Sequence, residues 1–415
     1  MDKAPILDFI RDHINAADKS SHEQIQKTLQ TIRTHLGLEV AFLAEFTEGQ
    51  RVFRYVDSSH PQSPIHVGGA DPLEESYCQR IIDGRLPELI LDATQLPAAQ
   101  ELAVTTALPV GAHLSVPVRL KDGTLYGTFC CFSFTPNQSL NERDLAIMRV
   151  AAEFAAAQIE HYREAERLKS EIRERIYAVL SGDALSMVYQ PIYHLAENRV
   201  VGLESLARFF TTPMRSPDIW FNEAAYVDLS IPLELMAIQL ALDGIKHFPA
   251  DTYVAVNISP KTILDGKLGD ALAGWPLGQI VLEVTEHAVI DHYDDITRVV
   301  NPLRQRGLRI AVDDAGAGYA SFRHILNLAP DVIKLDISIT RNIDTDRSRR
   351  ALAAALISFA QETGSKIVAE GVETASELAV LQELGINKAQ GYFLGKPMSL
   401  KDASQLVQNG CSSLV

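Results

Sequence analysis

Two short apolar runs end in charged residues that can do chemistry. The run at 310–312 ends in Asp313 and Asp314, and the run at 332–333 ends in Lys334. Apolar runs rich in β-branched residues are typical of strands buried on both faces, as in parallel sheets, and the amphipathic stretch between these two runs can form a crossover helix. In a (β/α)₈ barrel the carboxyl ends of the strands build the active site. Two carboxylates and an ammonium at that pole predict chemistry on a phosphate with metal ions.

Length and composition indicate two soluble domains. The chain has 415 residues, 47% of them hydrophobic, and no apolar run reaches the roughly 18 residues that a membrane span needs. The N-terminus lacks the apolar core of a signal peptide, so we expect a cytoplasmic protein without membrane contact. A formal net charge of −15 argues against a nucleic-acid polymer as partner.

Residues 1–165 are expected to form an α+β domain. A helix containing Ile25 and Ile32 precedes expected strands, and Lys121, Asp122 and Gly123 form a hairpin turn signal between the last two. The expected strands cover residues 40–46, 89–92, 114–120 and 126–134. This order, closed by a long helix, resembles a GAF domain, a small-ligand sensor.

The ligand of this domain is unknown from the sequence. Cys78 can be a chromophore-binding or redox thiol, and His60, His66 or His113 can touch a haem. A lone Cys or His is more often a packed or solvated residue, and we favour that interpretation for all four. Of the four cysteines in the chain, Cys130 and its neighbour Cys131 would point to opposite faces of a strand, which indicates reduced thiols.

The pattern from 145 to 180 predicts one long helix, with residues 166–180 as the linker between the domains. Apolar residues recur in steps of three and four, and the cluster of both charge signs at 163–175 suits a solvated helix or a coiled-coil flank. Two interpretations stand side by side. Either the helix forms a parallel homodimer that joins sensor to effector, or its first half packs on its own sensor domain and its second half merely precedes the barrel.

Residues 181–415 predict a (β/α)₈ barrel of the TIM type. Strand-like runs recur with charged or amide residues at their ends, separated by segments long enough for helices. Besides the two runs described first, they cover residues 188–192, 200–209, 253–259, 280–286, 366–373 and 388–395. The first two of these lie too close for a crossover helix, so a hairpin is expected to make one strand antiparallel.

The residues gathered at one pole supply oxygen ligands without sulfur or imidazole. They are Glu204, Asn257, Glu283, Asp313, Asp314 and Glu370. Such a set selects Mg²⁺ or Mn²⁺, and its size predicts two ions, with Asp313 as the candidate bridge. Two ions can clamp a phosphodiester and activate a water, Lys334 can hold or deprotonate that water, and Arg208 can bind a phosphate.

The same residues 181–405 resemble the EAL domain, the family of bacterial cyclic di-GMP phosphodiesterases. The matching motifs are YQPI at 189–192, ESLAR at 204–208, VNIS at 256–259, EVTE at 283–286, DDAGAGYAS at 313–321, KLD at 334–336, AEGVE at 369–373 and QGYFLGKP at 390–397. The resemblance implies hydrolysis of cyclic di-GMP to linear pGpG by two metal ions, with a GAF domain that sets the rate.

The resemblance also implies roles for individual residues. The six oxygen donors would hold metal, Glu370 directly or through water, and Lys334 would serve the nucleophilic water. Catalytic residues would be Lys334, Glu370 and Glu286, the last as an anchor of the loop 315–321. Substrate contacts would come from Gln190, Leu206, Arg208, Asp336 and Gln390, with Gln390 also positioning the water.

Two positions depart from the family pattern. Ser205 replaces the alanine of the EAL motif and, by strand alternation, points away from the ligand side chain. Ala315 replaces the usual Phe after the aspartates and removes an aromatic anchor from the loop. We favour an active enzyme because no ligand position is lost. The alternatives are a weak or inactive cyclic di-GMP receptor that signals through protein contacts, and a scaffold with a vestigial barrel.

Overall fold

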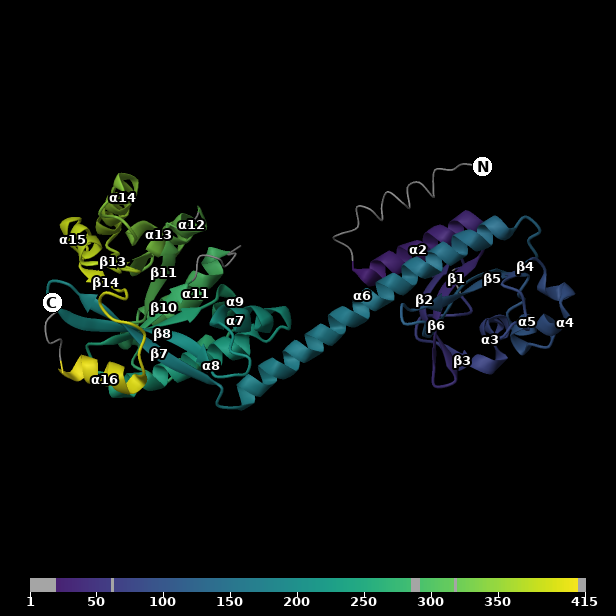
Figure 1. Cartoon of the computed structure of the whole chain (residues 1–415), viewed down its shortest axis with the longest axis horizontal. Coiled ribbons are helices and arrows are strands. Elements are labelled where there is room, and N and C mark those ends of the chain that lie inside the picture. The colour runs from purple at the N-terminus through teal and green to yellow at the C-terminus, as the bar shows by residue number, and fades with distance from the viewer. Residues whose placement is uncertain (1–19, 61–62, 285–291, 317–318, 410–415) are drawn as a thin grey trace. The chain divides into compact units, whose positions relative to one another are not determined.

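The computed structural model describes residues 20–60, 63–284, 292–316 and 319–409 (Figure 1). The chain divides into two compact units, Met1–Leu168 and Lys169–Val415. None of the described helices is both long enough and apolar enough to span a membrane.

The first unit is built on an antiparallel six-stranded sheet with strand order β3-β2-β1-β6-β5-β4. Its strands are β1 (Val40–Thr47), β2 (Gln50–Ser58), β3 (Ala70–Pro72), β4 (Leu89–Ile90), β5 (Ala112–Arg119) and β6 (Leu125–Ser133). Its helices are α2 (Ser21–Leu36), α3 (Tyr77–Ile82), α4 (Pro97–Gln100) and α5 (Ala103–Ala107), with short 3₁₀ turns η1 (Leu73–Glu75) and η2 (Ala93–Gln95). The predicted helix and strands are confirmed, whereas β2 and β3 were not anticipated.

Two cores lie on the two faces of this sheet. Cys131 belongs to the core under α2, and its neighbour Cys130 belongs to the core on the other face, as strand alternation predicts. Cys78, Cys130 and Cys131 are free thiols. The predicted hairpin is present between β5 and β6, where Gly123 takes a positive φ of 84°.

Helix α6 (Glu142–Ser181) is continuous over 40 residues, as the periodicity predicts. Met148 and Ile159 are buried in the core of the first unit, and Ile172 and Ile176 are buried in a core of the second unit. The first half of the helix therefore packs on its own domain, and the second half packs on the barrel unit as well as preceding it. A homodimer through this helix stays a prediction.

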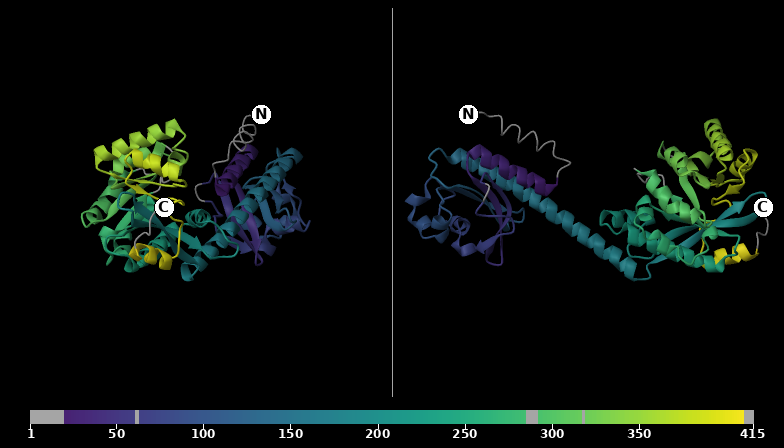
Figure 2. Two further views of the ribbon diagram at one scale, coloured as in Figure 1. Left: turned by 60° about the vertical axis from the view of Figure 1, so that its left-hand side comes forward. Right: turned by 180° about the vertical axis from the view of Figure 1, so that it is seen from behind.

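The second unit is a closed barrel with strand order β10-β11-β12-β13-β14-β7-β8-β9, and helices surround it (Figure 2). Its strands are β7 (Leu185–His194), β8 (Arg199–Phe209), β9 (Tyr253–Ile258), β10 (Ile280–Val284), β11 (Arg309–Ala315), β12 (Val332–Leu335), β13 (Lys366–Ala369) and β14 (Lys388–Ala389). Strand β7 runs antiparallel to both neighbours and the other pairs are parallel, which confirms the predicted hairpin and fold class.

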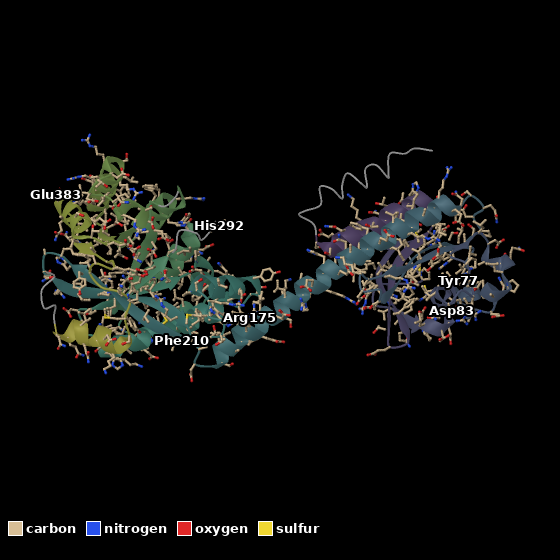
Figure 3. All side chains as sticks on the ribbon, viewed as in Figure 1. Tyr77, Asp83, Arg175, Phe210, His292 and Glu383 are labelled. Carbon is tan, nitrogen blue, oxygen red and sulfur yellow. The ribbon has the colours of Figure 1, made fainter. Side chains whose placement is uncertain are left out.

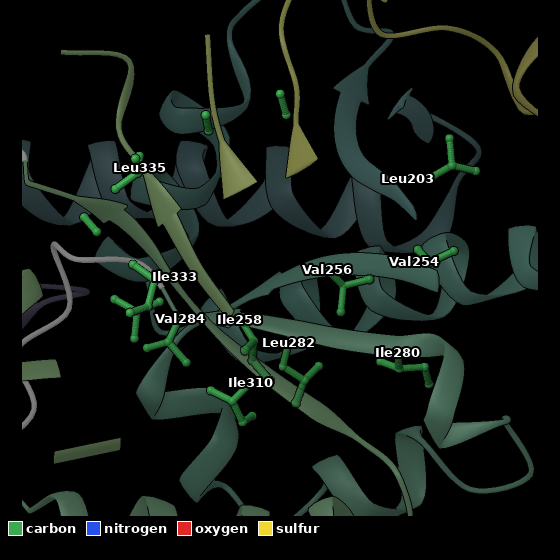
Figure 4. Packing of buried hydrophobic residues seen from close by; sticks show 14 of the residues in the cluster. Leu203, Val254, Val256, Ile258, Ile280, Leu282, Val284, Ile310, Ile333 and Leu335 are labelled. Atoms are coloured by element: carbon green, nitrogen blue, oxygen red, sulfur yellow. The ribbon is translucent and has the colours of Figure 1, made fainter. Parts of the chain in front are cut away.

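The helices of this unit fill the connections between the parallel strands. They are α7 (Pro217–Tyr226), α8 (Ser230–Asp243), α9 (Pro260–Leu264), α10 (Leu268–Ala271), α11 (Tyr293–Arg304), α12 (Tyr319–Leu328), α13 (Ile337–Thr340), α14 (Arg347–Thr363), α15 (Ala375–Glu383) and α16 (Leu400–Asn409), with 3₁₀ turns η3 (Gly244–His247) and η4 (Leu277–Gln279). The outward side chains of the strands, such as Leu282, Ile310 and Ile333, form one large core (Figure 4).

The inward side chains form layers inside the barrel. One layer is apolar and consists of Ile192, Val201, Tyr253, Ala255, Val281, Ala311, Val332 and Val368. Two residues further along their strands, Val281, Ala311 and Val332 are followed by Glu283, Asp313 and Lys334. Because side chains alternate with a period of two, those polar groups also point inward, one layer nearer the carboxyl ends.

One glycine of β8 makes room for the apolar layer. A Cβ on Gly202 would lie 2.3 to 2.6 Å from carbons of the Tyr253 ring. The ring is 5% exposed and cannot move aside easily, so the absence of a side chain at Gly202 is a packing requirement.

We therefore expect Gly202→Ala to lower the unfolding free energy of the barrel by about 1–3 kcal/mol through overpacking. Both tryptophans of the chain, Trp220 and Trp275, lie in the second unit, so tryptophan fluorescence during urea denaturation reports on the barrel. Gly269→Ala is the matched control, because nothing lies within 4 Å of its added Cβ. Equal midpoints for the two variants would contradict the packing described for Gly202.

Candidate active site

Four carboxylates converge on one buried ammonium at the carboxyl ends of the strands. Lys334 Nζ lies 2.7 Å from Glu370 Oε1, 2.9 Å from Glu283 Oε2, 3.1 Å from Asp313 Oδ1 and 3.5 Å from Glu204 Oε1. The lysine is 1% exposed. The structure thus brings together five of the residues that the sequence places at this pole.

The electrostatics of this cluster favour additional cations. Burial alone would lower the pKa of Lys334, but the four surrounding carboxylates raise it well above its usual range. Burial raises the pKa of Glu283 and of Glu370 well above the ordinary value, and repulsion from the neighbouring carboxylates adds to this despite Lys334. One ammonium therefore does not balance the buried negative charge, and a cation would relieve it.

The carboxylates form two groups that can each hold a metal ion. Glu204, Glu283 and Asp313 make one group, and Asp313, Asp314 and Glu370 make the other. Within each group the ligand oxygens lie within 4.8 Å of one another. Asp313 belongs to both groups, which fits the bridging position predicted for it.

Backbone geometry lets two adjacent aspartates serve the same pole. Consecutive residues of a regular strand face opposite sides, but Asp314 takes a positive φ of 53°, and the pairing of β11 with β12 is irregular between Val312 and Ala315. On the neighbouring strands Asn257 of β9 pairs with Glu283 of β10. Asn257 is exposed at this pole, next to the first carboxylate group in register.

A pair of glutamines extends the polar network. Gln390 Nε2 donates to Gln190 Oε1 at 3.0 Å and also to Glu204 Oε2, and Gln190 Nε2 donates to the carbonyl of Gly395 at 3.1 Å. Gln390 Oε1 is buried and has no partner in the described part of the chain. A buried acceptor without a partner is costly, so this atom is suited to a bound water or a ligand hydroxyl.

A cavity of about 580 Å³ adjoins this pole. Four predicted site residues line it, namely Leu206, Arg208, Asn257 and Asp314. It is also lined by Asp218 and Asn222 of α7 and by Glu234 of α8, which the sequence analysis missed. The spacing of Asp218 and Asn222, four residues apart on one helix, was a signal for a shared polar face.

Some predicted residues have other surroundings. Asp336 caps α13, where its Oδ1 accepts a hydrogen bond from Ser338 N at 2.8 Å, and it does not line the cavity. Its role as a substrate contact stays a prediction. Glu286 lies outside the described residues. Ser205 Oγ donates to the carbonyl of Ala255 at 2.7 Å on the neighbouring strand.

A second cavity lies in the first unit, between the sheet and α3 and α5. It is small, about 20 Å³, and its lining includes Phe42, Arg51, Tyr77 and His113 (Tyr77 is labelled in Figure 3). His113 stacks on Tyr77 with ring centroids 4.8 Å apart, and its Nδ1 is buried without a partner among the described atoms. Burial lowers the pKa of His113 to about 3, and the charge of Arg51 adds to this.

Cys78 lies beside this second cavity. Arg51 Nη1 donates to Cys78 Sγ at 3.2 Å, and Cys130 Sγ lies 3.6 Å from it. Burial raises the pKa of Cys78, but the hydrogen bond with Cys130 and the charge of Arg51 together lower it to about 6. Cys78 and His113 are packed and His60 and His66 are exposed, as expected, but the arginine next to Cys78 was not anticipated.

Comparison with known proteins identifies both units. The model of the EAL domain matches residues 170–397, and the model of the GAF domain matches residues 20–159. The probable cyclic di-GMP phosphodiesterase PdeD of Escherichia coli K12 is 30% identical over 223 residues, 51% of this chain and 41% of that protein. The cyclic di-GMP phosphodiesterase NbdA of Pseudomonas aeruginosa PAO1 is 30% identical over 242 residues, 55% of this chain and 31% of that protein. The matches therefore span less than half the length of these curated relatives.

Solved structures show the same architecture. The PaMucR phosphodiesterase in complex with c-di-GMP has 26% identity and a TM-score of 0.51, covering 56% of this chain and 99% of that one. The EAL enzyme Bd1971, bound to cAMP and cyclic di-GMP, has 17% identity and a TM-score of 0.57, covering 89% of this chain and 93% of that one. At 17% identity the second likeness shows the fold alone.

The sharing of Asp313 between two carboxylate groups predicts unequal effects on metal binding. We expect the wild-type protein to bind two Mn²⁺ ions, Glu283→Gln to retain one, and Asp313→Asn to weaken both by about tenfold or more. Calorimetric titration of the chelator-treated protein measures this. Equal stoichiometry and affinity in the two variants would contradict the shared position of Asp313, and exposed Glu383 provides a control as Glu383→Gln.

The buried, neutral His113 predicts acid sensitivity of the first unit. Its pKa in the folded state is about 3 against 6.5 for a free histidine, so the folded state binds fewer protons than the unfolded state between these values. The contribution of neutral His113 to the unfolding free energy of the first unit is therefore fully present above pH 6.5. Between pH 6.5 and about 3 it falls by about 1.4 kcal/mol per pH unit. Hydrogen exchange of the β5 and β6 amides measures this, and His113→Leu should flatten the slope while His66→Leu, at an exposed position, should not.

Proposed function

The chain belongs to the EAL domain family, and we propose that it is a phosphodiesterase that hydrolyses one phosphodiester bond of cyclic di-GMP to give linear pGpG. The observation that carries the proposal is the pair of carboxylate groups that share Asp313 beside the 580 Å³ cavity. The relatives named as cyclic di-GMP phosphodiesterases support the choice of substrate.

The donor set fits two hard divalent cations, Mg²⁺ or Mn²⁺. Glu204, Glu283 and Asp313 would hold one ion and Asp313, Asp314 and Glu370 the other, with Asn257 as a further oxygen donor. Bound ions of this kind supply a water of lowered pKa and neutralise charge on the phosphoryl oxygens. All donors are oxygen atoms, and the buried negative charge of the site matches cations.

Lys334 holds rather than takes a proton in this proposal. Its Nζ lies within 3.5 Å of four carboxylates, which favours an ammonium there, and we propose that Nζ donates hydrogen bonds to the attacking water or to a phosphoryl oxygen. This supports the first of the two roles considered from the sequence, in which Lys334 holds the water. Gln390 Oε1, the buried acceptor without a partner, accepts a hydrogen bond from the same water, and Gln190 fixes the Gln390 amide.

The cavity next to the carboxylates takes the rest of the substrate. Arg208 binds a phosphate, and Leu206 offers an apolar contact from the same strand. Asp336 completes the proposed substrate contacts, and the role implied for Glu286, which lies outside the described residues, stays a prediction. A weak or inactive receptor is less well supported, since the full donor set is present and Ala315 is buried in register with Leu335 without displacing a carboxylate.

The GAF domain is proposed to set the rate of hydrolysis. Helix α6 contributes Met148 to the core of the GAF unit and Ile176 to a core of the barrel unit, so a change in the first core alters a helix that is also part of the second. The proposed regulation acts in a cytoplasmic homodimer. Opening of the small cavity around Arg51 and His113 by a ligand is the proposed signal.

We expect Glu204→Gln to lower the rate of pGpG formation by about a hundredfold, since the change removes a metal-binding carboxylate that also contacts Lys334 and Gln390. Chromatography of cyclic di-GMP incubated with the protein and Mg²⁺ or Mn²⁺ measures the rate, with a chelator-treated sample as blank. Glu383→Gln removes an exposed glutamate that pairs with Arg350 and should leave the rate unchanged (Figure 3).

Two outcomes would count against the proposed function. Wild-type protein that binds cyclic di-GMP with metal present and forms no pGpG would be a receptor. Full activity of Glu204→Gln would remove Glu204 from the metal site.

A further inference from the structure

The amino-terminal pole of the barrel carries a layer of basic side chains. Arg309 and Lys366 stand two residues before Ala311 and Val368 of the apolar layer, so strand alternation points them to the same interior side. Lys388 begins β14 in register with Val368. The hairpin between β7 and β8 adds His194 and Arg199, which lie opposite each other in the strand register at this end of the barrel.

Four of these basic side chains line a cavity of about 320 Å³ together with one carboxylate, Asp251, whereas Lys366 lines a neighbouring cavity. Its lining includes His194, Arg199, Tyr253, Arg309 and Lys388. Two cations share one aromatic ring, because Arg309 Cζ lies 4.6 Å and Lys388 Nζ lies 5.2 Å from the centroid of Tyr253. The packing of Tyr253 against Gly202 fixes this ring, so both cations have a rigid support.

Acidic neighbours neutralise only part of this charge. Arg199 pairs with Glu197 and with Asp251. In contrast, Arg309 donates to the carbonyl of Gly278 at 3.1 Å, and neither Arg309 nor Lys388 forms an ion pair with a described carboxylate.

Besides burial, the excess positive charge lowers the pKa of Lys388. Burial lowers the pKa of Lys388, and the charges of Arg309, Lys366 and Arg199 lower it further, against a smaller opposing effect of Glu197. Asp331 acts on Arg309 from a distance, but its carboxylate already pairs with Arg304 at 2.8 Å. Basic side chains that serve only solubility extend into water. Arg199, Arg309 and Lys388 instead line one cavity, where their mutual repulsion and partial burial cost free energy that a bound anion would offset.

We propose that this amino-terminal pole binds a phosphate-bearing small molecule, with the phosphate held among Arg199, Arg309 and Lys388. A guanidinium fork matches phosphate oxygens in pairs, and two further cations favour a phosphate of charge −2 or more. A neighbouring cavity of about 370 Å³ shares His194 and Lys388 with the 320 Å³ cavity. It is also lined by Ile357, Ile367 and Asn387, so a nucleoside can be accommodated next to the phosphate.

This site is separate from the proposed catalytic pole. The apolar layer of Val201, Val281, Ala311, Val332 and Val368 lies between the two, and the catalytic pole without metal is acidic and repels anions. The proposal goes beyond phosphodiester hydrolysis and stands if that activity fails.

Isothermal titration of the full chain at low ionic strength, with a chelator present, tests the proposal. Pyrophosphate should bind the wild-type protein, and Lys388→Gln should weaken binding about tenfold or more because a charge-assisted contact is lost. Lys401→Gln, which removes an exposed lysine, should bind as the wild-type protein does. Absence of pyrophosphate binding, or equal binding by Lys388→Gln, would overturn the proposal.

Further titrations locate the anion and identify its source. Glu204→Gln removes a repelling charge from the catalytic pole and should leave pyrophosphate binding unchanged. Tighter binding by this variant would place the anion at the catalytic pole and overturn the proposal. Tighter binding of GMP than of inorganic phosphate supports a nucleotide whose nucleoside occupies the neighbouring 370 Å³ cavity, whereas equal binding supports a free phosphate.

A fold control separates binding from a structural role of Lys388. Without ligand, Lys388→Gln should not lower the urea midpoint of tryptophan fluorescence, since the change removes a positive charge that other cations repel. Pyrophosphate should raise the midpoint of the wild-type protein alone. A lower midpoint for the unliganded variant, with unchanged pyrophosphate binding, would show that Lys388 serves packing on Tyr253.

Discussion

The buried ammonium of Lys334 among four carboxylates is the interaction on which the barrel depends. At 1% exposure, an unpaired charge at this depth would cost several kcal/mol, and the same holds for Glu283. The carboxylates outnumber the ammonium, so the pole is electrostatically incomplete without further cations. The proposed phosphodiesterase activity would need this imbalance, because a pole neutralised by side chains alone would have little affinity for the metal ions of the proposed mechanism.

The closed topology makes such a concentration of charge possible. Strand alternation sets Glu283, Asp313 and Lys334 one layer above an apolar plug, and the antiparallel β7 brings Gln190 to Gln390, 200 residues away in the chain. The carboxylates are therefore backed by a buried apolar layer. Rigid placement keeps like charges close, where a flexible loop would let them separate.

The sequence predicted the carboxylate pole because the patterns that indicate it, apolar strand runs and the charged residues after them, are local. An apolar run with a carboxylate at its end indicates a strand, its direction and the face of the carboxylate, and the structure brings Glu283 and Asp313, together with Glu204 within β8, to the same ammonium. Asp218 and Asn222 were missed because the orientation of α7 depends on packing against the barrel, which no local pattern encodes. Arg51 was missed for the same reason, since its contact with Cys78 joins a strand to a helix that follows it by 27 positions.

The same alternation explains why charge gathers at both ends of the barrel. An inward-facing residue is charged where the apolar layer ends. On β11 the inward positions are Arg309 on one side of the layer, Ala311 within it and Asp313 on the other side. The carboxyl ends lead into the helices and loops that line the 580 Å³ cavity, so their charges are available to the proposed catalysis. The amino ends carry basic side chains, which is locally unusual in a chain with a net charge of −15. The proposed anion site gives this cluster of cations a function.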